Sequence, residues 1–456
     1  MPDGLDMLLL ARIQFAFTIS FHILFPAFTI GLAGYLVYLE AAWLRTGRDL
    51  YRELYDFWLK LFAISFGMGV VSGIVMSYQL GTNWSGFSAA TGNVLGPLLG
   101  YEVLMAFFLE ASFLGVMLFG RGRVGPRMHF AATLIVAVGT LFSAFWILAA
   151  NSWMQTPAGY ELRDGVFHAT DWLEVIFNPS LPYRFTHMVL ACYLSTALVV
   201  VAVGAYHLAR DPGQRHARAM LAIGLPFIAV VGTVQALVGH AHGENVHHHQ
   251  PAKLAAMEGH WASYDGHAPL ILFALPDEAA ETNRFELAIP SVGSLVVTGS
   301  FDGAIRGLRS WPEADRPPVV PVFLSFRVMV GLGVAIIALG AFGTWWLRQG
   351  HLADHPRFLR FAVWMAPAGF VALLAGWFTA EIGRQPYVVY GLLRTADAAS
   401  PVSADAVGMS LLVYVAVYLL IFGSGLFFLL ELARRGPHGE EAAASGAGAE
   451  ADAEGT

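Results

Sequence analysis

Cysteine is almost missing from this sequence. Its 456 residues contain one cysteine, Cys192, and that residue lies inside an apolar run. A single thiol excludes an intrachain disulfide, a cysteine-ligated iron–sulfur cluster and covalent haem attachment through a C-x-x-C-H motif.

Charge is also scarce. Charged residues make up 13% of the chain and hydrophobic residues 56%, whereas a soluble domain has about 25% charged residues. The N-terminal stretch "MPDGLDMLLLARIQ" has no basic residue ahead of its apolar residues, so no cleaved signal peptide is predicted. These features exclude a soluble globular protein.

Long hydrophobic runs are present instead, and each is long enough for a membrane-spanning helix of ~20 residues. The nine runs lie at about 13–40, 57–80, 95–120, 128–150, 184–209, 217–239, 321–347, 359–381 and 409–433. We therefore predict an all-α fold, a polytopic membrane bundle of nine transmembrane helices.

The arginines predict how this bundle is oriented. They cluster in alternate connections, at Arg45, Arg48, Arg52, Arg121, Arg123, Arg127, Arg210, Arg215, Arg218, Arg348, Arg357, Arg360, Arg434 and Arg435. Connection 81–94 has no Lys or Arg, and 151–183 has only Arg163. Basic residues mark the cytoplasmic side, so we expect the N-terminus outside and the C-terminus in the cytoplasm.

The predicted spans divide the chain into four parts. Residues 1–239 carry helices 1–6, 240–320 an extracytoplasmic loop, 321–435 helices 7–9, and 436–456 an Ala/Gly/Glu-rich cytoplasmic tail that we expect to be disordered. The loop is long and contains aromatic and aliphatic residues, which favours a folded, functional insert. Its "HAHGENVHHHQ" run, at 240–250, is either a divalent-metal site or a solvated polar loop.

Few ionisable or metal-ligating side chains lie in the spans. The candidates weighed here, with Arg384 just past the eighth run, are His22, Glu102, Glu110, His187, Arg327, Met329, Glu381 and Arg384. Imidazole, thioether and carboxylate groups ligate haem iron, and bundle interiors hold cofactors, so these residues favour a haem protein. The alternatives are a hydrogen-bonded structural His, a Met that fills a core gap and an Arg384 that reaches the interface.

Glu102 and Glu110 are harder to explain structurally. Each costs ~2.5–3.5 kcal/mol on insertion scales. They stand eight residues apart, which is about 12 Å along an α-helix and roughly 80° around it. Proton relay through an internal cavity is the leading interpretation.

Ordered motifs across nearly the whole chain resemble those of one family. They are "RIQFAFTISFHILFP", "LGTNWSGFS", "YEVLMAFFLE", "WILAANSWMQTP", "AKLAAMEGHW", "ETNRFELAIP", "FRVM" and "GWFTAEIGRQPY". Together with nine spans and a long outer loop between spans 6 and 7, this set resembles subunit I of cytochrome bd-type quinol oxidases.

The resemblance implies specific roles for residues of this sequence. It implies that His22 and Glu381 ligate the haems of the oxygen site and that His187 and Met329 are the axial pair of a low-spin haem b. It assigns Lys253 and Glu258 to quinol oxidation. It also assigns haem support to Arg327, Trp377 and Arg384, and the oxygen site and proton delivery to Glu102, Glu110 and Ser143.

Two departures resemble the short-loop, cyanide-insensitive branch of the family. Tyr387 follows G-R-Q-P where many members have Trp, and the outer loop lacks a long insertion. The resemblance then implies a low-spin haem b, a high-spin haem b, and either haem d or a further haem b.

The resemblance also implies partners, a location and a reaction. It implies an integral-membrane subunit II, leaves small single-span subunits open, and places the protein in a bacterial cytoplasmic membrane with quinol and oxygen as substrates and no nucleic-acid partner. Quinol is then oxidised outside and oxygen reduced with protons taken from the cytoplasm, which separates charge without pumping. Two alternatives stay open, a non-oxidase di-haem membrane cytochrome and a secondary transporter, although the sequence has no inverted repeat.

Overall fold

A computed structural model describes residues 6–437 of the chain. The predicted disordered tail, 436–456, lies almost entirely outside the described residues.

Nine helical segments among the described residues are long and apolar enough to cross a membrane. Seven are single helices: α1 (Met7–Thr46), α2 (Asp49–Thr82), α5 (Pro126–Gln155), α7 (Leu181–Arg210), α8 (Arg215–His249), α11 (Val319–Arg348) and α14 (Ala404–Arg435). Each of the nine matches one predicted run, and the predicted bundle of nine helices is confirmed.

Two of the nine segments are interrupted helices. The third joins α3 (Ser85–Met105) to α4 (Ser112–Phe119) through a π-helix at Ala106–Ala111. The eighth joins α12 (Pro356–Trp364) to α13 (Ala368–Ile382). Pro367, which lies in the gap between them, has no N–H for a helical hydrogen bond and disfavours helix in the residue before it.

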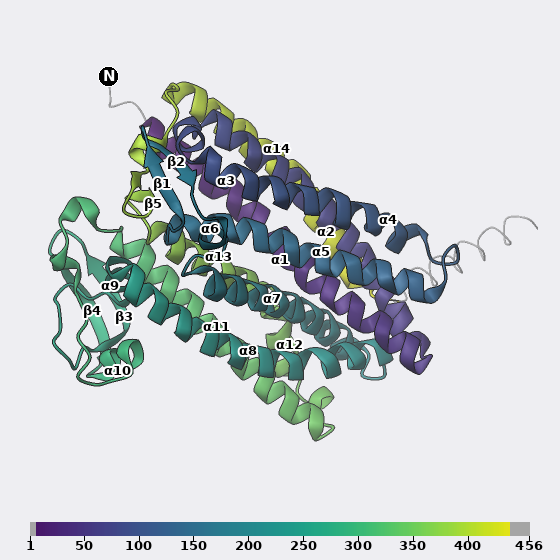
Figure 1. The fold of residues 1–456 in the computed structure, drawn as a ribbon. Coiled ribbons are helices and arrows are strands. Elements are labelled where there is room, and N and C mark those ends of the chain that lie inside the picture. The colour runs from purple at the N-terminus through teal and green to yellow at the C-terminus, as the bar shows by residue number, and fades with distance from the viewer. Residues whose placement is uncertain (1–5, 438–456) are drawn as a thin grey trace, which may run out of the picture.

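The short elements gather at one end of the bundle, which we call the hairpin end (Figure 1). Three antiparallel hairpins lie there: β1 (Tyr160–Arg163) with β2 (Val166–Ala169), β3 (Leu270–Asp277) with β4 (Thr282–Ile289), and β5 (Tyr387–Val389) with β6 (Leu393–Arg394). Helices α6 (Trp172–Ile176), α9 (Pro251–Glu258) and α10 (Val292–Thr298) accompany them. Short 3₁₀ turns occupy Leu308–Ser310, Glu313–Asp315 and Ala396–Ala398, and a fourth, Leu352–Asp354, lies between α11 and α12 at the opposite end.

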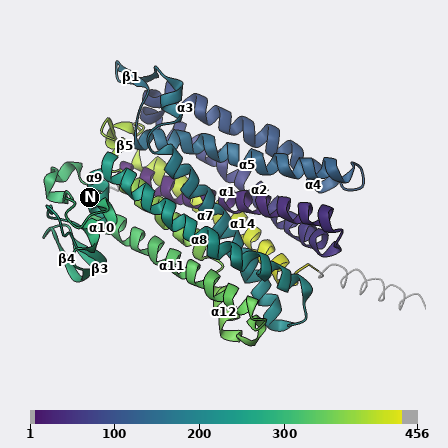
Figure 2. The same cartoon turned by 60° about the horizontal axis from the view of Figure 1, so that its bottom comes forward.

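The opposite end, where α4 and α12 lie, carries the arginine-rich connections, and we call it the arginine end (Figure 2). Helix α1 begins at the hairpin end, where Leu10 shares a core cluster with Phe167 of β2 and Val389 of β5. Which end faces the cytoplasm stays a prediction.

Helix α8 is longer than the sequence analysis predicts. It continues to His249, so 240–249 is helical, whereas the predicted loop begins at residue 240. The helix stops just before Pro251, because a proline disfavours helix in the residue before it. The rest of the insert has its own apolar cluster, which includes Leu254, Trp261 and Leu308.

Four helices form a closed ring in one half of the bundle. α7 packs on α8, α8 on α11, α11 on α13, and α13 on α7. In the other half, α1 lies between α2, α5 and α7. Both halves bring residues from the ends of distant spans together at the hairpin end, and this determines the geometry of the site.

Candidate haem and quinol site

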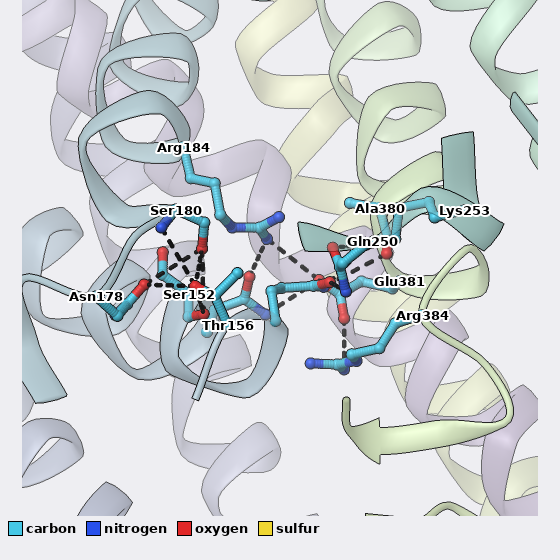
Figure 3. Close-up of polar contacts among 12 residues, drawn as sticks. Ser152, Thr156, Asn178, Ser180, Arg184, Gln250, Lys253, Ala380, Glu381 and Arg384 are labelled. Atoms are coloured by element: carbon cyan, nitrogen blue, oxygen red, sulfur yellow. Dashed lines mark hydrogen bonds and ion pairs between the residues drawn. The ribbon is translucent and has the colours of Figure 1, made fainter. Parts of the chain in front are cut away.

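The Glu381 carboxylate lies at the end of α13, among donors from three other segments (Figure 3). Its Oε2 is 2.5 Å from Arg384 Nη2, and its Oε1 is 3.4 Å from Arg184 Nη2 of α7. Asn151 and Gln155, at the end of α5, each donate an amide N–H to Oε1 at 3.1 Å. Two guanidinium groups therefore neutralise this carboxylate.

Lys253 belongs to the same cluster. Its Nζ donates to Gln155 Oε1 at 2.5 Å and to Gln250 Oε1 at 2.7 Å, and the residue is only 2% exposed. Burial, together with the positive charge of Arg184, holds the pKa of Lys253 well below its usual range, against the opposing effect of Glu381. Gln155 thus connects a residue predicted to act on quinol to a residue predicted to bind iron.

Glu258, at the other end of α9, pairs with α11. Its Oε2 accepts a bond from Arg327 Nη2 at 2.9 Å, and Arg327 Nε donates to the Ile271 carbonyl at 2.8 Å. Glu258 is 5% exposed. Arg327 was predicted to support haem, but its polar contacts here are with a predicted quinol residue and with β3.

His187 and Met329 face glycines within the four-helix ring. A Cβ at Gly239 of α8 would lie 3.1 Å from His187 Cε1, and a Cβ at Gly376 of α13 would lie 2.7 Å from Met329 Sδ. His187 Nδ1 is buried without a hydrogen-bond partner. The His242 ring of α8 lies 5.8 Å from the His187 ring.

His22, on α1, faces α2. Its Nδ1 is 2.9 Å from Ser72 Oγ, and a Cβ at Gly73 would lie 3.2 Å from its Cε1. Among the described residues, no hydrogen bond or ring contact connects His22 to the cluster around Glu381.

Glu102 and Glu110 both face α5. Ser143 Oγ donates to Glu102 Oε1 at 3.2 Å, and a Cβ at Gly139, one turn away, would lie 3.1 Å from Glu110 Cγ. Glu110 is buried, and its Oε1 has no partner. The structure therefore brings Glu102 and Ser143 into direct contact.

The π-helix at Ala106–Ala111, which contains Glu110, corrects the predicted angle of roughly 80°. A π-helical bond runs to the fifth residue instead of the fourth, so this segment takes up one extra residue per turn. Glu102 and Glu110 then stand about as seven α-helical residues would, only about 20° apart around the axis. Both carboxylates consequently share one face.

The chain matches the family model for cytochrome bd terminal oxidase subunit I over residues 10–437. It belongs to this family. Cytochrome bd-II ubiquinol oxidase subunit 1 of Escherichia coli (strain K12) is 33% identical to it, covering 95% of this chain and 97% of that protein. Cytochrome bd ubiquinol oxidase subunit 1 of Bacillus subtilis (strain 168) is 35% identical, covering 92% of each.

A solved structure agrees with this assignment. The bd oxidase from Geobacillus thermodenitrificans superimposes with a TM-score of 0.88 at 30% identity, covering 95% of this chain and all of the matched chain. Family membership and nine membrane-capable helices among the described residues make this cytochrome bd subunit I family member an integral membrane protein. The short-loop branch stays a prediction.

The residues around Glu381 fit the haem that is expected of this family. Even without Lys253, two guanidinium groups face one carboxylate, which leaves positive charge uncompensated. Arg184 Nε and both Nε and Nη1 of Arg384 are buried without partners. Such donors suit haem propionates, because a buried charge persists when it is paired. The glycines facing His22, His187 and Met329 let these three potential ligands lie directly against the neighbouring helices.

The sequence analysis missed several members of this cluster. Arg184 marked the start of a span and was not weighed, and Asn151, Gln155 and Gln250 were also passed over. A signal was available, because Asn151 and Gln155 lie in the quoted motif "WILAANSWMQTP" and Arg184 precedes His187 by three residues. Intramembrane polar residues are functional candidates by default.

Two further predictions find less support. Trp377 makes an edge-to-face contact with its neighbour Phe378, and among the described residues no hydrogen bond connects it to the cluster around Glu381. In the described part of the chain, no group of three or more His, Cys, Asp or Glu side chains is arranged to hold a metal ion. The histidine run at 240–249 contains no such group.

Proposed function

We propose that this chain is subunit I of a terminal quinol oxidase in a bacterial cytoplasmic membrane. In the complete reaction, two quinols lose four electrons and four protons and become two quinones, while one O₂ takes up four electrons and four protons and becomes two waters. The observation that carries the proposal is the contact of Lys253 and Glu381 with the same amide, that of Gln155. Residues expected to handle quinol and haem thus form one cluster.

Four side chains would hold haem iron. His187 and Met329 are the proposed axial pair of a low-spin haem b, and His22 and Glu381 the proposed ligands at the oxygen site. When bound, haem supplies one-electron carriers and an iron at which oxygen is reduced. Arg184 and Arg384, which hold Glu381 in place, are suited to pair with propionates. Whether haem d is present is left to the experiment below.

Quinol oxidation is assigned to Lys253 and Glu258 of α9, at the hairpin end. Glu258 has one carboxylate oxygen engaged by Arg327, and its other oxygen is suited to accept a proton from a quinol hydroxyl. Lys253 is suited to hold a quinol oxygen by donating a hydrogen bond. With the hairpin end outside, as the arginine distribution predicts, these protons leave on the outer side.

Protons for water would come from the cytoplasmic side through Glu110 and then Glu102. Glu110 lies nearer the arginine end, and Ser143 holds Glu102 by a hydrogen bond. Protons released outside and taken up from inside separate charge without pumping.

The family and its relatives' names also suggest the partners. We infer an integral-membrane subunit II, and we leave accessory single-span subunits open. Relatives are named ubiquinol oxidases, and one, 29% identical, is named a putative menaquinol oxidase subunit, so the quinone type is open. Membership of an oxidase family favours this proposal over a transporter.

The test is co-expression with the partner subunit, followed by three measurements on the purified complex. We expect an extracted-haem chromatogram to show haem b, carbon monoxide to change the reduced spectrum, and oxygen uptake to start when a ubiquinol or menaquinol is added. A colourless, correctly assembled complex would overturn the proposal. Haem without carbon monoxide binding or oxygen uptake would instead favour the di-haem cytochrome.

A further inference from the structure

Ser72 Oγ lies between the His22 ring of α1 and the backbone of its own helix, α2. This oxygen lies 2.9 Å from His22 Nδ1 and also 2.9 Å from the Gly69 carbonyl oxygen. A carbonyl oxygen only accepts, and a serine hydroxyl has one hydrogen to donate. The hydroxyl therefore donates to Gly69 and accepts from His22 Nδ1–H. His22 Nε2 is left with its lone pair, which is the form of imidazole that binds iron.

The surrounding α1–α2 contact keeps Ser72 and His22 in register. Two further pairs lie along the same contact: Gln79 Nε2 donates to Thr18 Oγ1 at 2.9 Å, and Asn83 Nδ2 donates to Gln14 Oε1 at 3.0 Å. Thr18 and His22 are one turn apart on α1, and Ser72 and Gln79 two turns apart on α2. Buried polar pairs between helices fix their relative position, because a slip would leave the partners unsatisfied.

The α2 backbone at Gly73 also limits the space on one side of the His22 ring. Gly73 follows Ser72, and a Cβ there would lie only 3.2 Å from His22 Cε1. The imidazole therefore lies directly against the α2 backbone, with Nδ1 held by the neighbouring hydroxyl. Ser72 itself is fully buried.

We propose that Ser72 is a positioning residue that holds His22 in the iron-binding tautomer. The proposal rests on the proposed function, in which His22 is a haem ligand. A hydrogen bond from the far nitrogen of a ligating histidine fixes the ring and makes it more basic. More basic imidazole favours ferric over ferrous iron, so loss of Ser72 raises the midpoint potential of the haem that His22 ligates. A hydroxyl that only joins two helices would have no such effect.

Three variants of the two-subunit complex test this. Ser72→Ala removes the hydroxyl, and Ser72→Thr keeps one. Ser65→Ala is the matched control, because Ser65 is equally buried on α2, two turns away, and its Oγ has no hydrogen-bond partner among the described residues. The readouts are the midpoint potential of the oxygen-site haem and the rate at which an apo-haem protein extracts it.

We expect Ser72→Ala to weaken haem retention about 10–100-fold and to shift the midpoint potential upward. Ser72→Thr and Ser65→Ala should behave as wild type, and the low-spin haem spectrum should not change. If Ser72→Ala matches Ser65→Ala in both readouts, the inference is wrong.

If Ser72→Ala does not assemble, Ser72→Val replaces it, compared with the equally large Ser72→Thr. Equal haem retention and equal midpoint potential in Ser72→Val and Ser72→Thr would then overturn the inference. Weaker haem retention and a raised potential in Ser72→Val alone would support it. A wild-type complex without haem would refute the proposed function itself, which is a distinguishable result.

Discussion

Glu381 and Glu110 are both carboxylates with little exposure, but the chain surrounds them differently. Glu381 is 11% exposed and has two arginines within ion-pair distance. Glu110 is 6% exposed, and in the part of the chain that the structure describes it has no ion-pair partner. A buried carboxylate beside cations is a fixed charge, whereas one without a cation can be buried as the neutral acid, which carries a proton. The comparison separates a site built to hold charge from one suited to transfer protons.

The largest expected effect is on stability, and it is seen by comparing two single variants, Glu381→Gln and Glu110→Gln. Glu381→Gln leaves Arg184 and Arg384 facing a neutral amide, and breaking a buried ion pair from one side costs about 3–5 kcal/mol. Glu110→Gln leaves no cation behind and should cost much less. We expect a lower yield and a clearly lower unfolding temperature for Glu381→Gln alone, measured by thermal unfolding of the detergent-purified complex.

A surface pair controls for that experiment. Glu431 and Arg435 form an exposed pair on α14 at 2.9 Å, and such pairs contribute about 0.5 kcal/mol or less. Glu431→Gln should leave the unfolding temperature unchanged. Equal destabilisation by Glu381→Gln and Glu110→Gln would contradict the distinction between the two sites.

The second effect concerns turnover. If Glu110 carries protons, Glu110→Gln should slow oxygen reduction about 10²-fold, because a positioned acid–base group contributes at least that much. The low-spin haem spectrum should stay intact, since His187 and Met329 lie in a different part of the bundle. Oxygen uptake with excess quinol measures the rate. Normal turnover in this variant would remove Glu110 from the proton path.

The third effect is a pH dependence that belongs to the charged cluster alone. In the unfolded chain, Lys253 keeps its proton up to about pH 10.4. In the folded chain it releases the proton at lower pH, because burial lowers the Lys253 pKa. Between the folded-state pKa and the unfolded-state pKa of Lys253, the unfolded state binds more protons than the folded state. The free energy of unfolding therefore rises with pH, by at most about 1.4 kcal/mol per pH unit. Lys253→Met should abolish this rise and add stability at neutral pH.

Unfolding temperatures of wild type and Lys253→Met, taken from about pH 7 to about pH 10, measure the rise. Lys60→Met, at an exposed position of α2, is the control and should keep the wild-type slope. A slope unchanged by Lys253→Met would mean that Lys253 holds its proton as readily in the folded as in the unfolded chain.

The sequence analysis predicted the parts of this comparison unequally. Hydrophobic length predicted all nine spans, because a spanning helix must satisfy its backbone internally over ~20 residues. It also identified Glu381, Arg384, Lys253 and Glu110 individually. It did not predict that Lys253 and Glu381 share Gln155, since that contact depends on how α5, α9 and α13 meet at one end.

Two local features were missed for different reasons. Asp164 and Gly165, both with positive φ, form the two-residue turn between β1 and β2, and Asp-Gly is a readable hairpin signal that was not used. The π-helix that contains Glu110 has no such signal in the sequence. It packs against α5, and it is the reason that the predicted angle between Glu102 and Glu110 was wrong.

The smallest expected effect comes from Ser143, whose hydroxyl makes the one hydrogen bond to the Glu102 side chain among the described residues. Ser143→Ala removes a single hydrogen bond, worth about 1 kcal/mol. Glu102 would then lose its preferred orientation without losing its proton-binding group, so oxygen uptake should fall only several-fold, well short of the Glu110→Gln effect.

Ser424→Ala is the control for this variant, because Ser424 donates to its own helix at Leu420 on an exposed face of α14, and its uptake rate should equal that of wild type. The ratio of the Ser143→Ala and Glu110→Gln oxygen-uptake rates shows whether Ser143 only orients Glu102 or itself transfers a proton. If orienting Glu102 matters less than keeping the Glu110 carboxylate, Ser143→Ala takes up oxygen faster than Glu110→Gln by an order of magnitude or more. If Ser143→Ala is as slow as Glu110→Gln, the serine hydroxyl must itself transfer the proton, and the relay then includes a group on α5 as well as the two carboxylates.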